Sequence, residues 1–590
     1  MTPFTKILVA NRGEIAVRIF RTLRELGIAT VAVYSEADRT KLHVQRADEA
    51  YLIGPGPAAD SYLRGDRIIE AAMRSGAEAV HPGYGFLAEN AAFARQVEEA
   101  GLVWIGPSAD AIQAMGSKIA ARERMQAAGV PIVPGTTQSA ETVASALSAA
   151  REVGFPVAIK ASAGGGGKGL RIARSEQEIE RAYETARREG EAYFADPAVY
   201  VERYLDDPRH VEVQVLADDH GNVAHLGERD CTIQRRHQKL VEETPSPAVD
   251  DELRARIGAI AVDAARAVDY RSAGTVEGLL GSDSSYYFLE MNTRVQVEHT
   301  VTEAVTGIDI VREQVLIAAG QPISFVQEDV ILRGHAIECR INAEDVACGF
   351  MPSPGRITAY REPAGIGVRV DSGVAAGDEI SDLYDPLIAK LVVHDVDRER
   401  ARHRMLRALD EFVIEGPKTL LGFHRALLST KCFIEGETCE GVVESEELAE
   451  RAQELEQLSH AKTKVVASSD GAPRTRQQLV TVELDGRRHE VRLHVAEPAW
   501  AELARRHRER SKGLAGAETG AVVSPMQGTV LAVNVADGDE IRAGGLICVV
   551  EAMKMENEIV SHRDGVVSEL GVAAGQQVTS GQLICVVTSA

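Results

Sequence analysis

The chain has 590 residues, of which 45% are hydrophobic and 26% charged, and its formal net charge is −23. This length predicts about three to five domains with ample cores, and the acidic balance argues against nucleic acid as a partner. No apolar run approaches the ~18 residues that cross a bilayer, so no membrane segment is expected.

The N-terminus and the cysteines bear on the cellular compartment. A strand pattern begins at Lys6, so no signal peptide is expected. The seven cysteines form no CxxC pair, and an odd number without metal-ligand spacing predicts reduced thiols. Together these features predict a cytoplasmic protein.

Residues 1–115 alternate between strand and helix patterns, which predicts a parallel sheet with crossover helices. The first turn lacks a GxGxxG dinucleotide motif. The loop His81–Phe86 follows a predicted strand and is either a ligand-binding loop or a structural turn. Strands are predicted over 6–10, 29–35, 77–83 and 103–106, and helices over 14–27, 66–76 and 90–101.

A glycine-rich stretch, 161–169, follows the predicted strand 156–160. Its backbone amides are able to approach phosphates because no Cβ obstructs them; a flexible linker is the alternative. Ser162 stands where a Walker A loop has its first glycine, and the next residues have a strand pattern. A glycine loop between two strands resembles ATP-grasp enzymes, in which Lys118 and Lys160 would face the phosphates.

A hairpin is predicted over 210–230, and it leads into a basic segment that ends at Lys239. Arg235 and Arg236 are interpreted as a solvated turn. Lys239 begins an alternating stretch and is able to point into a cleft to meet a small anion.

The stretch Glu290–His299 carries the strongest catalytic signal. Period-2 alternation predicts a strand with a polar face and an apolar face. The polar face consists of Glu290, Asn292, Arg294, Gln296 and Glu298.

Glu277 and Glu290 lie at equal distances from a turn at 281–285, so they are expected to face each other across a hairpin. Like charges placed opposite each other destabilise a sheet. Mg²⁺ bridging the two carboxylates and nucleotide phosphates would compensate them; an ordinary exposed polar face is the alternative.

Residues 446–520 carry weaker signals. An exposed helix is predicted over 441–460, a linker over 462–478 and a hairpin over 479–495. A short basic helix over 497–512 and a second linker over 513–520 follow.

The C-terminal region contains a duplication. Gly528–Ala552 aligns without gaps on Gly565–Ser589, an offset of 37 (565 − 528). Each copy has the pattern of short strands divided by turns, so the two are expected to pack as a β-sandwich. Lys554 lies between two methionines on the segment that joins the halves, where a solvated turn lysine is the alternative to a functional one.

The duplicated halves and the sequence AMKM around Lys554 closely resemble the biotinyl domain of biotin-dependent carboxylases. That family attaches biotin to the lysine ε-amine, which implies biotin on Lys554. Lipoyl domains share the duplicated fold and are the second candidate, but they usually carry an acidic residue where this chain has Met553.

Six motifs in family order make residues 5–445 resemble biotin carboxylase. The resemblance implies an α/β multidomain chain, with a Rossmann-like domain over 1–115, an ATP-grasp domain over 116–333 and an α+β domain over 334–445. A linker region over 446–520 and an all-β biotinyl domain over 521–590 follow. The motifs are GYGFLAEN, KASAGGGGKG, RHVEVQVLAD, ERDCTIQRRHQK, EMNTRVQVEH and GHAIECRINAED.

The resemblance also implies a role for each site residue. Glu298 would deprotonate bicarbonate, and Arg340 would stabilise the enolate-like oxygen of biotin. Bicarbonate would contact Lys239, Arg294, Gln296 and Val297, and Mg²⁺ or Mn²⁺ would be held by Glu277, Glu290 and Asn292. ATP would contact Lys118, Lys160, Gly164, Gly165, Gly166, Gly167, Lys168, Gly169, Glu202, His210, Gln234 and His237.

The expected activity is ATP-dependent carboxylation of biotin by bicarbonate. No remaining segment is long enough for a carboxyltransferase, so a separate β subunit is expected as partner, together with a biotin protein ligase and a homo-oligomeric arrangement. A carrier scaffold with an inactive ATP-grasp half and an ATP-grasp ligase of other specificity are the alternatives. The site set argues against the scaffold, and the biotinyl domain argues against the other ligase.

The carrier assignment predicts that Lys554→Arg abolishes biotinylation, because the variant keeps the charge but loses the primary amine. Protein made together with a biotin ligase is expected to carry one biotin by intact mass, the variant none, and the control Lys512→Arg one. Biotin on any other lysine would contradict the assignment.

Overall fold

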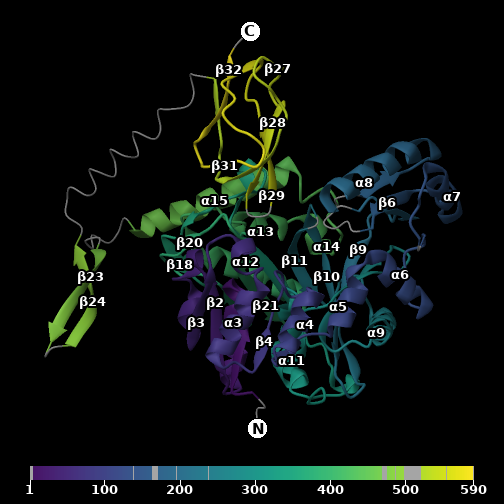
Figure 1. The fold of residues 1–590 in the computed structure, drawn as a ribbon, viewed down its shortest axis with the longest axis horizontal. Coiled ribbons are helices and arrows are strands. Elements are labelled where there is room, and N and C mark those ends of the chain that lie inside the picture. The colour runs from purple at the N-terminus through teal and green to yellow at the C-terminus, as the bar shows by residue number, and fades with distance from the viewer. Residues whose placement is uncertain are drawn as a thin grey trace. The chain divides into compact units, whose positions relative to one another are not determined.

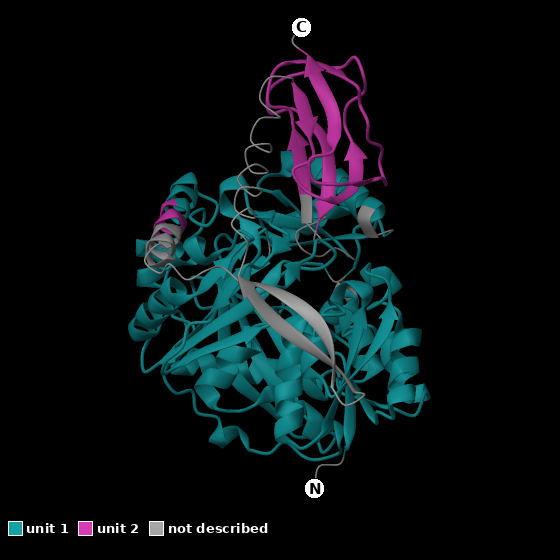
Figure 2. Cartoon of the chain, turned by 90° about the vertical axis from the view of Figure 1, so that its left-hand side faces the viewer, with its two compact units in different colours: residues 1–453 teal, residues 454–590 magenta. Residues whose placement is uncertain are grey.

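The structure is a computed structural model that describes residues 4–136, 138–162, 170–194, 196–236, 238–467, 475–484, 487–496, 520–552 and 555–588. The chain divides into two compact units, residues 1–453 and 454–590 (Figure 2). None of the described helices combines the length and the apolar character that a membrane span requires.

The N-terminal region, purple in Figure 1, contains the predicted parallel sheet, in the order β3-β2-β1-β4-β5. Separate apolar clusters cover its two faces, which explains why its strands are almost continuously apolar. The sequence analysis missed β3, whose side chains are mostly half-buried. The elements are β1 (Lys6–Val9), α1 (Gly13–Glu25), β2 (Ala29–Ser35), α2 (Leu42–Arg46), β3 (Glu49–Gly54), α3 (Gly65–Ser75), β4 (Ala79–His81), α4 (Ala91–Glu99) and β5 (Val103–Trp104).

A small antiparallel sheet, β7-β6-β8, follows. The predicted strands on either side of the glycine stretch are confirmed as β6 (Val157–Ala161) and β7 (Leu170–Ala173). Residues 163–169 between them lie outside the described residues. The other elements here are α5 (Ala109–Gly116), α6 (Lys118–Ala127), α7 (Val143–Val153), α8 (Ile179–Phe194) and β8 (Val199–Arg203).

An eight-stranded antiparallel sheet dominates the first unit, in the order β13-β12-β9-β10-β11-β14-β21-β19. It continues without a break across the expected boundary at 333, because β14 pairs with β11. The strands are β9 (Arg209–Ala217), β10 (Val223–Arg235), β11 (Gln238–Thr244), β12 (Ser272–Leu280), β13 (Tyr286–Asn292), β14 (His335–Asn342), β19 (Val368–Ser372) and β21 (Leu387–Asp395).

The predicted strand over 290–299 is too long. β13 ends at Asn292, and residues 293–298 form an irregular turn before α10 (His299–Thr306). Glu298 is the N-cap of α10 and does not share a strand face with Arg294. The alternating pattern misled because Val295, Gln296 and Glu298 are all buried in this turn, so the change from apolar to polar residues does not mark the two faces of a strand.

Helices and short strands complete the first unit. Its last helix, α15 (Glu446–Ala467), crosses the boundary of the units and extends into the predicted linker 462–478. The others are α9 (Asp251–Arg266), α11 (Ile310–Ala318), β15 (Glu344–Asp345), β16 (Met351–Pro352), β17 (Gly355–Arg356), β18 (Ala359–Arg361), β20 (Glu379–Ile380), α12 (Arg398–Glu411), β22 (Val413–Glu415), α13 (Leu421–Leu427) and α14 (Lys431–Glu435).

Two cysteines correct the expectation of reduced thiols. Cys432 and Cys439 form a disulfide, with 5.4 Å between their Cα atoms. Spacing alone did not suggest this pair, because the turn after α14 brings the two residues together. The other five cysteines, at 231, 339, 348, 548 and 585, are free.

The second unit contains the predicted hairpin and the predicted sandwich. β23 (Thr475–Leu484) pairs with β24 (Arg487–Ala496), while the predicted helix 497–512 lies outside the described residues. The sandwich has two four-stranded sheets, β25-β32-β30-β27 and β29-β28-β26-β31. Its strands are β25 (Ala521–Val523), β26 (Gly528–Val533), β27 (Glu540–Ile541), β28 (Leu546–Ala552), β29 (Met555–Val560), β30 (Gly565–Ser568), β31 (Gln577–Val578) and β32 (Leu583–Thr588).

The two repeats of the sandwich exchange a strand. β27 of the first repeat pairs with β30 of the second, and β31 of the second pairs with β26 of the first. Each sheet is therefore incomplete without the other repeat, which gives a physical reason for the duplication. β28 pairs with β29 through Ala552 and Met555; Lys554 lies between these strands, outside the described residues.

Candidate active site

A row of charged residues crosses four strands of the large sheet. Cross-strand pairing joins Glu290 on β13 to Glu277 on β12, Glu277 to Glu212 on β9, and Glu212 to Arg229 on β10. The predicted opposition of Glu277 and Glu290 is confirmed, and the structure adds a third carboxylate to it. Three acids in one row require positive charge close by.

Lys239 supplies much of that charge. It lies on β11 opposite Gln234, and its ammonium contacts Glu212 at 2.6 Å, Glu298 at 2.7 Å and Glu277 at 3.0 Å. Burial by itself lowers the pKa of Lys239, but the three carboxylates outweigh it and raise that pKa well above its ordinary value. Lys239 is therefore a permanent cation.

Glu298 lies between two cations. One carboxylate oxygen accepts from Lys239 and the other from Arg340, at 2.9 Å. Burial favours the protonated form, but Lys239 and Arg340 outweigh it and lower the pKa of Glu298. The carboxylate is therefore ionised and able to accept a proton.

Arg340, on β14, has Glu242 and Glu298 as partners. Burial raises the pKa of Glu242 to about 8, although Arg340 at 2.6 Å lowers it. Arg340 therefore shares its charge between the carboxyl groups of Glu242 and Glu298.

Glu277 accepts three hydrogen bonds and makes a further close contact with His210. Its Oε1 accepts from Gln296 at 2.6 Å, Asn292 at 2.7 Å and Lys239, and its Oε2 lies 2.7 Å from Nε2 of His210. Burial alone raises the pKa of Glu277, but Lys239 and His210 lower it well below its ordinary value. Glu277 therefore stays ionised.

A metal fits this arrangement. Glu277 and Glu290 project from opposed positions, and carboxylate oxygens are the ligands that Mg²⁺ prefers. Oε1 of Glu277 has three protein donors and Oε2 lies 2.7 Å from Nε2 of His210, and Glu277 and Glu290 would together hold the metal. Asn292 lies beside them, with its amide oxygen 3.0 Å from Arg294.

The remaining predicted anion ligands lie in the turn after β13. Arg294 is anchored by Glu89 at 2.8 Å, and Gln296 accepts from Arg229 at 2.9 Å. The carbonyl of Val297 accepts from Lys390 at 2.9 Å. These contacts fix a turn that has no strand ladder of its own.

The predicted nucleotide residues fall into three groups. His210 and Gln234 are in contact, at 3.0 Å, and Lys160 pairs with Glu202, which also binds Arg122 at 3.0 Å. Lys118 begins α6, but its side chain is not described. His237 and the loop residues Gly164, Gly165, Gly166, Gly167, Lys168 and Gly169 lie outside the described residues.

Sequence reasoning missed Glu212, Glu242 and Lys390. Glu212 had a signal, because His210, Glu212 and Gln214 recur at every second position of an otherwise apolar strand. Lys390 had none, since it is a single lysine in an apolar stretch, and it is fully buried against Val297 and Glu14. Arg235, interpreted as solvated, stacks 4.3 Å from the ring centre of Phe350.

This arrangement is able to bind a small anion beside an ionised carboxylate. Lys239 and Arg340 place positive charge beside the ionised carboxylate of Glu298, and Arg294 lies on the same turn as Glu298. Such chemistry matches the activation of bicarbonate.

Comparison with known families supports this interpretation. The biotin carboxylase N-terminal domain matches residues 3–112, the ATP-binding domain of the carbamoyl-phosphate synthase L chain matches 117–326, and the biotin carboxylase C-terminal domain matches 338–445. The biotin-requiring enzyme family matches 520–587.

Solved structures resemble the first part of the chain. Biotin carboxylase from Campylobacter jejuni has a TM-score of 0.72 and 45% identity, over 74% of this chain and 98% of that one. The biotin carboxylase domain of Hydrogenobacter thermophilus 2-oxoglutarate carboxylase has a TM-score of 0.70 and 50% identity, over 74% and 96%.

Related proteins cover either most of the first unit or nearly the whole chain with its carrier domain. Biotin carboxylase 1 of Bacillus subtilis is 56% identical over 433 residues, 73% of this chain and 96% of that protein. The biotin-dependent acyl-coenzyme A carboxylase alpha3 subunit of Mycobacterium leprae is 47% identical over 565 residues, 94% of each chain. The chain therefore belongs to the family of biotin-dependent acyl-coenzyme A carboxylase alpha subunits, in which a biotin carboxylase of the ATP-grasp class and a biotin carrier share one polypeptide.

Proposed function

We propose that the first unit converts ATP, bicarbonate and carrier-bound biotin to ADP, phosphate and carboxybiotin through the residues assigned above. The observation that carries the proposal is the contact of Glu298 with both Lys239 and Arg340. It keeps the base ionised beside the two cations that attract bicarbonate. The carboxylated biotin then gives up its carboxyl group at a carboxyltransferase.

Bicarbonate is proposed to bind Lys239, Arg294, Gln296 and the backbone of Val297. An incoming anion shares the charge of Lys239 and Arg340, and negative charge near Glu298 raises the proton affinity of its carboxylate. Binding of the substrate thus makes Glu298 a better base at the moment when a proton must be taken. ATP then activates the deprotonated anion in a site sheltered from water.

The nucleotide is proposed to lie against Lys160, Glu202, His210 and Gln234, with Lys118, His237 and the loop Gly164–Gly169, Lys168 included, around its phosphates. The Hydrogenobacter thermophilus domain was solved with MgADP and bicarbonate, which supports this choice of ligands. Glu277, Glu290 and Asn292 would hold Mg²⁺ or Mn²⁺, and a bound metal would neutralise the phosphate charge.

Biotin is proposed to enter on Lys554 and to present its ring to Arg340. A permanently charged guanidinium stabilises the negative oxygen that develops as biotin attacks CO₂. We also propose domain boundaries at 115, 333, 445 and 520. The boundary at 333 lies within the large sheet, because β11 and β14 pair across it.

The partners are proposed from the relatives. The Mycobacterium leprae protein is called an alpha subunit, which supports a separate carboxyltransferase β subunit, and the Hydrogenobacter thermophilus domain was solved as a dimer, which supports a homo-oligomer. A biotin protein ligase would load Lys554. The supply of ATP makes the cytoplasm the proposed compartment.

Glu298→Gln is expected to lower bicarbonate-dependent ATP cleavage at least about 100-fold, because an amide accepts no proton in place of the carboxylate. The assay uses the full chain with Lys554→Arg, so that free biotin is the only acceptor. The KM for ATP is expected to change little.

Glu70→Gln, on the exposed face of α3, is the matched control and is expected to retain full activity. Activity of Glu298→Gln within a few-fold of the parent would contradict the assignment of the base.

The biotinylated chain given ATP, bicarbonate and an acyl-CoA is expected to accumulate carboxybiotin on Lys554. Mass spectrometry should detect no carboxylated acyl-CoA until a purified β subunit is added, because the proposal places the transferase site on that subunit. Transfer by the chain alone, shown to be free of partner, would contradict the two-subunit proposal.

A further inference from the structure

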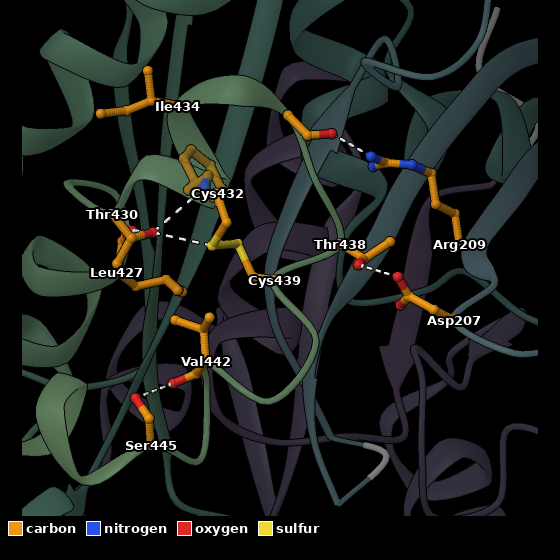
Figure 3. The surroundings of a disulfide bond; sticks show 12 residues. Asp207, Arg209, Leu427, Thr430, Cys432, Ile434, Thr438, Cys439, Val442 and Ser445 are labelled. Atoms are coloured by element: carbon orange, nitrogen blue, oxygen red, sulfur yellow. Dashed lines mark hydrogen bonds between the residues drawn. A yellow bond between two sulfur atoms is a disulfide. The ribbon is translucent and has the colours of Figure 1, made fainter. Parts of the chain in front are cut away.

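The Cys432–Cys439 disulfide closes the turn that follows α14 (Figure 3). Cys439 is buried and Cys432 is half-buried. Cys439 has a φ of 54°, in the left-handed region that residues other than glycine rarely adopt. The cross-link helps to hold this conformation.

The closed turn contacts the beginning of β9 at two points. Thr438 donates from its hydroxyl to Asp207 at 2.7 Å, and the carbonyl of Gly436 accepts from Arg209 (Figure 3). Both contacting residues lie between the two cysteines. Opening the cross-link therefore loosens this pair of contacts directly.

Arg209 connects the turn to the nucleotide residues. Its guanidinium also pairs with Asp230 at 3.1 Å, and Asp230 binds the backbone amide of Thr232 at 3.1 Å and its hydroxyl. The hydroxyl of Thr232 accepts from the amide of His210 at 3.1 Å. His210 follows Arg209 directly, so the turn supports the residue that we place beside ATP.

We propose that Cys432 and Cys439 are a reversible thiol–disulfide modification site that sets the affinity of the enzyme for ATP. The oxidised pair holds Gly436 and Thr438 against β9, and the reduced pair releases them. This inference rests on the proposed placement of ATP against His210 and Gln234. Arg209 acts here as a positioning residue.

The chemistry is thiol–disulfide exchange with a low-molecular-weight disulfide as oxidant. The thiolate of Cys432 attacks one sulfur of the oxidant and releases a thiol, and the thiolate of Cys439 then attacks the mixed disulfide and releases a second thiol. The two cysteines lose two protons and two electrons, and the oxidant gains them. A dithiol reverses the reaction.

The test compares the full chain after treatment with glutathione disulfide and after treatment with dithiothreitol. Alkylation of the unfolded protein is expected to label the five free cysteines in the oxidised form and all seven in the reduced form. The KM for ATP in bicarbonate-dependent cleavage is expected to rise about fivefold on reduction, the change that one lost hydrogen bond produces. The kcat is expected to change little.

Cys432→Ser with Cys439→Ser is expected to show the reduced KM under both treatments. Cys348→Ser, which alters an exposed free cysteine, is expected to respond as the wild type does. Labelling of all seven cysteines after oxidation would overturn the inference. Equal KM values for ATP would also overturn it, provided that mass measurement after alkylation shows one form to be oxidised and the other reduced. Loss of bicarbonate-dependent cleavage in both forms of the wild type would instead count against the proposed function.

Discussion

The site depends on the ion pairs that the ammonium of Lys239 makes. It contacts three carboxylates from β9, from β12 and from the N-terminus of α10. These carboxylates are nearly inaccessible to water, where mutual repulsion is poorly screened. Removal of one cation would leave several buried charges without compensation, which costs far more than the loss of a surface ion pair.

Arg229 also compensates the negative charge of Glu212. It is fully buried, and it donates to Glu212 at 2.5 Å as well as to Gln214, Gln296, Thr275 and Thr302. One guanidinium thus joins three strands to the turn that carries Gln296 and to α10. The same contacts that balance the charge also position the groups expected to meet bicarbonate, so stability and catalysis share one network.

The carrier follows a different principle. Its two repeats exchange short strands, so the apolar core around Val530, Ile547 and Ile584 forms only when both repeats are present. The residues of this apolar core all come from the sandwich itself. This independence suits a carrier that delivers a covalently bound group.

The fold and much of the site were accessible from the sequence, because their signals are local. Strand alternation and a central turn predicted the opposition of Glu277 and Glu290, and the offset of 37 predicted the sandwich. The partners of Arg340 and the buried Lys390 depend on pairing between β11, β14 and β21, which lie far apart in the sequence. The disulfide depends on a turn, and the position of Glu298 on a helix cap, for which strand periodicity gives no signal.

The protonation state of Glu298 tests the central claim most directly. Infrared difference spectra between the wild type and Glu298→Gln isolate the signal of this carboxyl as the pH is lowered from neutral to about 4.3, the ordinary pKa of a glutamate. The account predicts an ionised carboxylate throughout this range, and a protonated signal near neutral pH once Lys239→Met removes the ammonium. A wild-type Glu298 that takes up its proton near neutral pH, with Lys239 in place, would contradict the account.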